Sequence, residues 1–452
     1  MELKWIVLCI ALLMYSLVIV LQDKKVWFTT FAALLCLALG LIFPGAIFGT
    51  GGVEESSRFF VIYNAFTNLV SWNVLMIYVG AMTIASLFLY SKVPAKIADS
   101  LISVAPSTGV AIVLILAMTG LISIFVENVA TVLVMAPIAL SLCKKLKLNP
   151  TMFMVGLAVM SNLEGTATLV GDPPSMIFAA ASGYTFNDFF VHEGKLSIFF
   201  VIQTGLLVGC AFFYVIFSKI KEKTEIQGEK VISYFPAYLM LAMIFGLAAL
   251  SFASVSLEKI IPSAVMHNSS GIYVFVLALI GLVWYAFLQK KNKSELCTLI
   301  KELDWETIFF LIGIFIVVGA ISGVGLLSDF SHLLVRFSGG SKLLGFVTIL
   351  LVSIIISGFV DNVPYIMVML PVAQQMNASF GLGGDLFPFA LLIGSCLGGN
   401  LTPFGASANV VAMGILKNEG YPMSFSKWLK IGGTFTVLTT AASATVLWII
   451  WS

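Results

Sequence analysis

The stretch SNLEGTATLVGDPP, residues 161–174, interrupts an apolar segment that extends over residues 149–185. Its two consecutive prolines remove two backbone donors, and a proline disfavours helix at the residue before it. The sequence therefore predicts a helix that ends near Gly171 and a second helix that begins at Pro173, with Asp172 as its N-cap. Backbone groups that such a break leaves unpaired cannot face lipid, so we expect them to line a cavity or to contact protein.

The chain around this break is far more apolar than a water-soluble protein of its length. Of its 452 residues, 60% are hydrophobic and 10% are charged, and the mean hydropathy is +1.06. A spanning helix needs about 20 apolar residues. Such runs lie at residues 5–22, 26–45, 72–90, 196–218, 232–253, 271–289, 305–325 and 430–451, and longer interrupted ones lie at 107–143, 149–185, 342–378 and 384–415. We predict an all-α polytopic membrane protein with about ten transmembrane helices and two re-entrant hairpins.

The distribution of basic residues predicts the orientation. Lys and Arg are enriched in cytoplasmic loops. If the N-terminus is placed outside and each hairpin returns to its own side, most of the 24 Lys and Arg residues fall in one set of loops. This bias predicts a multi-pass protein of the cell membrane with both termini extracytoplasmic. Charge does not distinguish a re-entrant hairpin from one whose arms both cross the membrane.

An internal repeat relates the two halves of the chain at an offset of 234 residues, from Glu127 to Asp361. The matched positions are Glu127-Asn128-Val129 and Pro137 with Asp361-Asn362-Val363 and Pro371, then Leu163, Gly165, Thr168 and Gly171 with Leu397, Gly399, Thr402 and Gly405. Trp72 and Gly80 match Trp305 and Gly313 at an offset one residue smaller. The predicted topology orients the two units oppositely. Inverted repeats with broken helices are the architecture of alternating-access transporters.

This repeat predicts the domain organisation. We expect an N-terminal helix in residues 1–25, a first repeat in 26–230, a connector helix and loop in 231–270, and a second repeat in 271–452. The first repeat contains the hairpin 107–143 and the broken helix 149–185, and the second contains the hairpin 342–378 and the broken helix 384–415.

Each predicted hairpin carries a carboxylate and an amide in the middle of its apolar segment. These pairs are Glu127-Asn128 and Asp361-Asn362. An ionised carboxylate at membrane depth costs about 2.5–3.5 kcal/mol on insertion scales, so it needs a cation, a proton or a water-filled cavity. The alternative is that the acids only cap helix starts. We predict ion or proton coupling at these four residues, with sodium as the candidate metal ion.

The two broken helices supply mostly neutral oxygen and nitrogen groups. We predict substrate contacts from Asn162, Glu164, Thr166, Thr168, Asp172, Ser175, Asn400, Thr402, Ser407 and Asn409. For Glu164 and Asp172 a structural role, as a cap or a carboxylate in a shallow loop, is the alternative. No Lys or Arg lies within the four polar breaks. This favours a cation or a weakly charged oxyacid over a dianion as the substrate.

Other reactive side chains point to no further chemistry. The six cysteines are scattered without a CxxC pair, and Cys396 is expected to be a small core residue. His192, His267 and His332 fall in predicted external loops and are expected to be solvated. No nucleophile–base set, phosphate loop or metal-ligand cluster is apparent in the sequence, so we predict neither an enzyme nor a nucleic-acid-binding protein. No cofactor is expected beyond a coupling Na⁺ or H⁺.

Residues 161–174 resemble the Asn-x-x-Gly-Thr-Ala-Thr-x-x-Gly-Asp-Pro-Pro signature of arsenite-permease-like and melanosomal P-protein-like transporters. Residues 398–409 are similar to the second signature of these proteins. They belong to the ArsB/NhaD type of permease, with a citrate-transporter-like domain, within the ion transporter superfamily. The resemblance covers most of the chain and implies a scaffold domain, a transport domain with two re-entrant hairpins, and a homodimer.

The hairpin tips refine this resemblance. The related divalent-anion/sodium symporters carry Ser-Asn-Thr at each tip, where this chain has Glu127-Asn128-Val129 and Asp361-Asn362-Val363. Sodium–proton antiporters of the NhaD type carry Asp-Asn there, which is more similar. Their Gly-Asp segment lacks the double proline found here, so the resemblance is incomplete on that side as well.

We therefore predict a secondary active transporter of ions or small anions that works by elevator-like or rocking exchange in the lipid bilayer. Proton- or sodium-coupled antiport or efflux, of the sodium–proton or arsenite kind, is the first expectation. Cation-coupled uptake of citrate or a dicarboxylate is the alternative. An ion channel that uses the breaks as a filter, and the membrane subunit of a pump with a separate ATPase partner, are left open.

Overall fold

The structure of this chain is a computed structural model that describes residues 3–21, 24–43, 45–48, 58–223, 230–257, 262–337 and 339–452. Helices make up nearly all of the regular structure, which confirms the predicted all-α class. By length and composition, eight helical stretches of the described residues can cross a membrane, and four shorter helices are also apolar. The number of crossings and the re-entrance of the hairpins stay predictions.

The helices form two groups, and each group draws on both halves of the sequence. The first, which we call the side group, contains α1 (Leu3–Val20), α2 (Lys25–Ile42), α3 (Arg58–Asn64), α4 (Trp72–Tyr90), α11 (Phe235–Leu257), α12 (Ser263–His267), α13 (Ser269–Val283), α14 (Lys293–Lys301) and α15 (Trp305–Gly323). Within it, α4 packs against α13 and α2 packs against α15.

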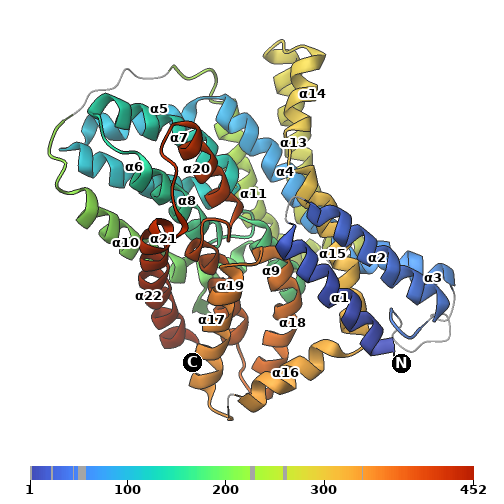
Figure 1. Ribbon diagram of the computed structural model, residues 1–452. Coiled ribbons are helices and arrows are strands. Elements are labelled where there is room, and N and C mark those ends of the chain that lie inside the picture. The colour runs from blue at the N-terminus through green and yellow to red at the C-terminus, as the bar shows by residue number, and fades with distance from the viewer. Residues whose placement is uncertain are drawn as a thin grey trace.

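The second group, which we call the hairpin bundle, holds the four polar breaks. It contains α5 (Val93–Val104), α6 (Thr108–Ser123), α7 (Asn128–Leu146), α8 (Thr151–Gly165), α9 (Pro173–Ser182), α10 (Ile198–Phe217), α16 (Leu326–Phe337), α17 (Lys342–Ser357), α18 (Asn362–Ser379), α19 (Leu386–Gly398), α20 (Ser407–Asn418), α21 (Phe425–Trp428) and α22 (Thr434–Trp451). The C-terminal α20 and α22 pack against α8 and α10, although they are far apart in sequence (Figure 1).

Short irregular elements complete the part of the chain that the structure describes. They are π-helical turns at Ala65–Leu69, Trp284–Leu288 and Leu429–Gly433, 3₁₀ turns at Asn187–Phe189 and Gly399–Leu401, and the strands β1 (Val191–His192) and β2 (Lys195–Leu196). The two strands pair antiparallel, with His192 opposite Lys195.

Two glycines at matched positions of the repeat allow the side-group helices to approach closely. A Cβ atom on Gly80 of α4 would lie 2.9 Å from Cγ1 of Val274 on α13. A Cβ atom on Gly313 of α15 would lie 3.1 Å from the backbone of Thr29 on α2. Small residues at helix interfaces let backbones pack tightly in membrane proteins. The same sequence position therefore serves the same packing role in both halves.

The first helix break is confirmed at one end and was predicted wrongly at the other. As expected, α9 begins at Pro173, and the Asp172 carboxylate accepts a 3.0 Å hydrogen bond from the Ser175 backbone N–H. However, α8 ends at Gly165, before the predicted Gly171. After Gly165 the backbone forms short turns instead of a helix. The Thr168 hydroxyl donates a 2.6 Å hydrogen bond to the Ile124 carbonyl of the first hairpin tip. This contact holds the segment out of the helix.

The same hydrogen bonds recur at the second tip, 234 residues later. The Ser123 hydroxyl donates to Asn128 Oδ1 at 2.7 Å, and the Ser357 hydroxyl donates to Asn362 Oδ1. Likewise, the hydroxyls of Thr168 and Thr402 donate to the carbonyls of Ile124 and Gly358. This recurrence supports the repeat read from the sequence. Its inverted orientation and the domain boundaries stay predictions.

Candidate functional site

The two hairpin tips and the two helix breaks meet at one cavity of about 60 Å³, which we call the central cavity. Its lining includes all four predicted coupling residues, Glu127, Asn128, Asp361 and Asn362. The remaining lining residues are Tyr78, Asn162, Asp172, Pro173, Pro174, Asp304, Thr307, Phe310, Val363, Gly405, Ala406, Ser407 and Ala408. Glu127 and Asp361 are both partly buried. Residues far apart in sequence are thus brought together.

The three cavity carboxylates that were predicted from the sequence also cap helices, by the same local rule. Glu127 accepts a 3.0 Å hydrogen bond from the Ala130 backbone N–H at the start of α7. Asp361 accepts one of 3.1 Å from the Val363 backbone N–H at the start of α18, and Asp172 caps α9. Such caps use one oxygen of each carboxylate. Capping and cation binding are therefore compatible, because the second oxygen remains for another partner.

The fourth carboxylate, Asp304, was missed by the sequence analysis. It caps α15, and its second oxygen accepts a 3.1 Å hydrogen bond from the Tyr78 hydroxyl of α4. Both residues belong to the side group, so the central cavity lies between that group and the hairpin bundle. In the repeat, Asp304-Trp305 of the second unit matches Ser71-Trp72 of the first. The second unit therefore has a carboxylate where the first has a hydroxyl, and this difference could have marked Asp304 as a candidate site residue.

A fixed positive charge adjoins the cavity, contrary to the sequence expectation. The Lys25 ammonium lies 3.5 Å from Asp361 Oδ2 and 5.4 Å from the centroid of the Phe310 ring. The four breaks indeed contain no Lys or Arg. Lys25 reaches Asp361 from the first residue of α2, just before the predicted apolar run 26–45. Four carboxylates line the cavity, and no Lys or Arg is among its described lining residues, so the site is acidic overall.

Of the predicted substrate contacts, Asn162, Asp172 and Ser407 line the central cavity. The side chains of Thr166, Thr168, Ser175, Asn400, Thr402 and Asn409 are buried and donate hydrogen bonds to backbone carbonyls instead. Glu164 is fully buried and is not among the residues that line the cavity. Its Oε2 atom accepts a 2.7 Å hydrogen bond from Gln203. These contacts give the seven side chains a structural role in this conformation. Their part in substrate binding stays a prediction.

Asn162 connects the two broken helices. Its Nδ2 group donates to Oδ1 of Asn400 at 2.8 Å and to Oδ1 of Asn409 at 2.9 Å. All three side chains are buried. The two units therefore meet through a buried amide cluster directly beside the central cavity.

A larger cavity of about 670 Å³ adjoins the central one. It is lined by residues of α4, α7, α14 and the π-helical turn at Trp284–Leu288, and it shares Glu127 and Asp304 with the central cavity. Another cavity of about 670 Å³ lies beside α9 and α18, and it shares no described lining residue with the central cavity. The central cavity is therefore continuous in its lining with the first of these two cavities, through Glu127 and Asp304.

No group of three His, Cys, Asp or Glu side chains among the described residues is arranged to hold a metal ion. A cation in the central cavity would therefore have at most two carboxylates as ligands and would complete its shell with amide, backbone and water oxygens. Cys396 is buried, as expected for a core residue.

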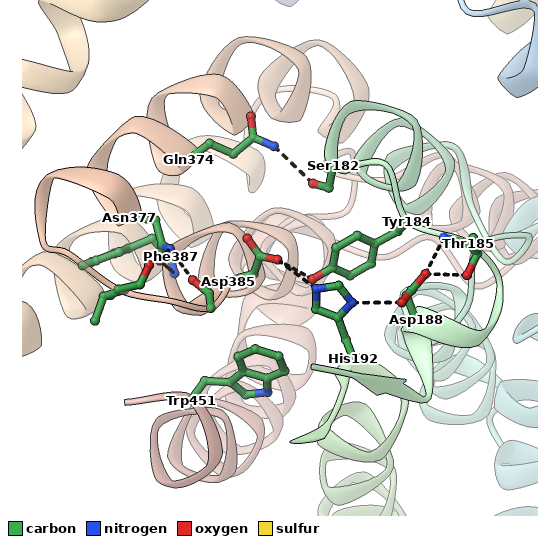
Figure 2. Close-up of polar contacts among 12 residues, drawn as sticks. Ser182, Tyr184, Thr185, Asp188, His192, Gln374, Asn377, Asp385, Phe387 and Trp451 are labelled. Carbon is green, nitrogen blue, oxygen red and sulfur yellow. Dashed lines mark hydrogen bonds and ion pairs between the residues drawn. The ribbon is translucent and has the colours of Figure 1, made fainter. Parts of the chain in front are cut away.

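The expectation that all three histidines are solvated is wrong for His192. Nδ1 of His192 lies 2.9 Å from the Asp188 carboxylate, and Nε2 lies 3.6 Å from Asp385 (Figure 2). Asp385 also accepts a 2.5 Å hydrogen bond from the hydroxyl of Tyr184, whose ring is 4.2 Å from the imidazole. The loop that follows α9 thus contacts the loop that precedes α19, because Asp188 of the first loop and Asp385 of the second both lie beside His192. The side chains of His267 and His332 are exposed.

The ionic contacts of this cluster shift the pKa of both partners. The hydrogen bond to Asp188 raises the pKa of His192 against the opposing effect of burial, and the charges of Asp188, Asp385 and Glu193 add to it. Burial alone raises the pKa of Asp188, but hydrogen bonds from His192 and Thr185 outweigh it and leave that pKa below its ordinary value. Both shifts favour a charged pair.

Comparison with known proteins identifies the family. The sequence model of CitMHS, described as a citrate transporter, matches residues 14–394. This chain belongs to the citrate transporter family CitMHS. It is 31% identical to the uncharacterized transporter Rv2685 of Mycobacterium tuberculosis over 387 residues, which cover 84% of this chain and 86% of that protein. It is 22% identical to the human P protein over 73% of this chain and 47% of the relative.

Solved transporter structures share the fold of this family member. The YdaH transporter of Alcanivorax borkumensis matches with a TM-score of 0.60 at 14% identity, covering 94% of this chain and 97% of that one. Neisseria gonorrhoeae MtrF matches with a TM-score of 0.56 at 14% identity, covering 93% and 94%. These matches confirm the predicted superfamily and the predicted resemblance of this chain to the P protein. The chain is a membrane transporter and not an enzyme.

Proposed function

We propose that this transporter couples the movement of its substrate to a small cation, Na⁺ or H⁺, which binds in the central cavity at Glu127 and Asp361. Antiport or efflux is the mode of transport that we favour. The observation that carries the proposal is the acidic lining of this cavity, where four carboxylates from both repeat units and from the side group converge.

Charge favours a cation at this place. Carboxylates at membrane depth are costly unless they meet a cation, a proton or water. The amides of Asn128 and Asn362 line the cavity beside the two tip carboxylates, so they can complete the coordination with neutral oxygens. Oxygen ligands of this kind suit hard cations.

Size points the same way. One water needs about 10–15 Å³ of cavity volume, so the central cavity of about 60 Å³ has room for a small ion with a few waters. Sites for drug-sized ligands occupy about 300–1,000 Å³. An organic anion would therefore need the adjoining cavity of about 670 Å³ or a different conformation.

A second candidate is cation-coupled transport of citrate or another carboxylate. The family description names citrate. One helix start at the cavity also suits an anion, because α20 begins after Ala406 without a side-chain cap, and free N–H groups at a helix N-terminus attract negative charge. In this mode the anion would enter together with a cation that the carboxylates bind.

The test is transport by purified protein in proteoliposomes with imposed sodium and pH gradients, with and without citrate. We expect a sodium or proton gradient to drive saturable flux, and Glu127→Gln and Asp361→Asn to abolish the coupling while the variants remain folded. Glu222→Gln is the control, because Glu222 is exposed and distant in sequence from both tips.

Coupling at the wild-type level in both tip variants would refute the assigned roles. Citrate flux that requires a cation would favour the second candidate, whereas a large conductance without saturation would indicate a channel.

A further inference from the structure

The ion pair between Lys25 and Asp361 is a feature that the proposed coupling mechanism leaves unused. The Lys25 ammonium lies 3.5 Å from Asp361 Oδ2, and the lysine side chain is only 16% exposed. Asp361 is a tip carboxylate of the central cavity. A cation supplied by the protein itself therefore occupies the oxygen that a substrate cation would use.

Local helix energetics do not explain this lysine. Lys25 is the first residue of α2, and a positive charge at a helix N-terminus is opposed by the helix dipole, which favours acids there. The ammonium also lies near the ring of Phe310, a residue that lines the central cavity. Its position is thus determined by the cavity and not by α2.

The two tips differ in this respect, although their sequences match. Asp361 uses one oxygen to cap α18 and the other to pair with Lys25. Glu127 caps α7 in the same way, but no Lys or Arg among the described residues pairs with it. The pair at the second tip also connects α2 of the side group to the hairpin bundle, so a movement between these groups must break it.

We propose that Lys25 is a built-in competitor that neutralises Asp361 when no cation is bound and releases it when Na⁺ binds. Lys25 then sets the affinity of the second tip and links cation occupancy to the contact between α2 and the α17–α18 hairpin. This inference rests on the proposed function, because it assumes that Asp361 binds the coupling cation.

The experiment measures equilibrium binding of ²²Na⁺ to the purified full-length protein, for the wild type and for Lys25 variants. One opposite charge at this distance changes the proton affinity of a carboxylate by about ten-fold or more. We expect Lys25→Met to tighten sodium binding by about the same ten-fold factor. Lys25→Arg keeps the charge and should bind sodium no more tightly than the wild type. Lys24→Met is the control, since Lys24 is the exposed neighbour.

Lys25→Gln repeats the test with a side chain that can still donate a hydrogen bond to Asp361, in case the methionine variant does not fold. An unchanged or weaker sodium affinity in both Lys25→Met and Lys25→Gln, with normal binding by the wild type, would overturn this inference alone. A loss of citrate binding with unchanged sodium affinity would also overturn it, in favour of Lys25 as an anion contact. Absence of sodium binding and of cation-driven flux in the wild type would refute the proposed function itself.

Discussion

Replacing His192 by phenylalanine should destabilise the cluster of Asp188, His192 and Asp385 in a way that depends on pH. The phenyl ring keeps the packing against Tyr184 and Trp451, whose rings lie 4.2 Å and 6.2 Å from the imidazole. The variant loses only the hydrogen bond to Asp188 and the longer contact with Asp385. The substitution therefore separates the ionic contribution of His192 from its ring stacking.

The magnitude follows from the geometry of the pair. A hydrogen bond to a charged group contributes about 1.5–3 kcal/mol. The side chains of His192 and Asp188 are 22% and 27% exposed, so solvent screens part of this energy. The contact with Asp385 at 3.6 Å is too long to add a full hydrogen bond. We expect His192→Phe to lower the free energy of unfolding by about 1–2 kcal/mol at pH 5.5.

The sign of the pH dependence follows from the two pKa shifts. The raised pKa of His192 means that its stabilising effect is complete below the ordinary histidine value of about 6.5 and is lost as pH rises through the folded-state pKa. The lowered pKa of Asp188 means that its effect is present above about 3.9 and is lost only as pH falls through the folded value. The pair is therefore fully charged between these limits, and pH 5.5 lies inside the window.

The assay is thermal unfolding of purified wild type and His192→Phe in detergent at pH 5.5 and pH 9. The difference in Tm should be a few degrees at pH 5.5 and should shrink at pH 9. His332→Phe is the control, because His332 is exposed and should shift Tm equally at both values. A Tm difference for His192→Phe that is the same at both pH values would refute the ionic account of this cluster.

Two further predictions concern packing beside the central cavity. In Gly165→Ala the new Cβ atom would lie 2.4 Å from Oδ1 of Asn128, so we expect a loss of about 1–3 kcal/mol in stability and reduced coupled flux. Gly414→Ala is the control, because nothing lies within 4 Å of its Cβ position; equal thermal stability of the two variants would contradict the prediction. Asn162→Ala removes the donor from two buried asparagine oxygens and should cost about 1–3 kcal/mol for each group left unpaired. The exposed Asn418→Ala is its control, and a chemical-denaturation midpoint within error of wild type in Asn162→Ala would contradict the assigned role of the amide cluster.

Long apolar segments and prolines were predictable from the sequence because their physical constraints are local. The start of α9 at Pro173 with Asp172 as its cap needs only the missing proline donor and the preference of Asp for N-caps. The convergence of Glu127 and Asp361 was predictable because the repeat places equivalent residues at equivalent turns. The end of α8 at Gly165 was not, since it depends on a hydrogen bond from Thr168 to the other segment of the unit.

The elements missed by the sequence analysis are short or owe their role to distant partners. The helices α5 and α16 have only 12 residues each, too few to stand out as membrane spans. For α14, the capping box of Asn292 and Glu295 was a local signal that could have been used. Lys25 carried no such signal, because its partner Asp361 lies in the other half of the chain. For His192, Asp188 four residues earlier was a local signal, but the contact with Asp385 could not be read from the sequence.

The repeat copies the geometry of the two tips but not their charge, and this difference has a consequence for coupling. Hydrogen bonds from Ser123 and Ser357 fix the tip amides in the same way. Glu127, however, adjoins the larger cavity together with Asp304, whereas Asp361 is already paired with Lys25. A cation that arrives through the larger cavity therefore meets an unpaired carboxylate first and a lysine-paired one second. If both tips bind cations, the first should bind more tightly, and Glu127→Gln should weaken sodium binding more than Asp361→Asn in the same ²²Na⁺ measurement. The reverse order would mean that the ammonium leaves Asp361 at little free-energy cost, and the charge asymmetry would then have no part in the mechanism.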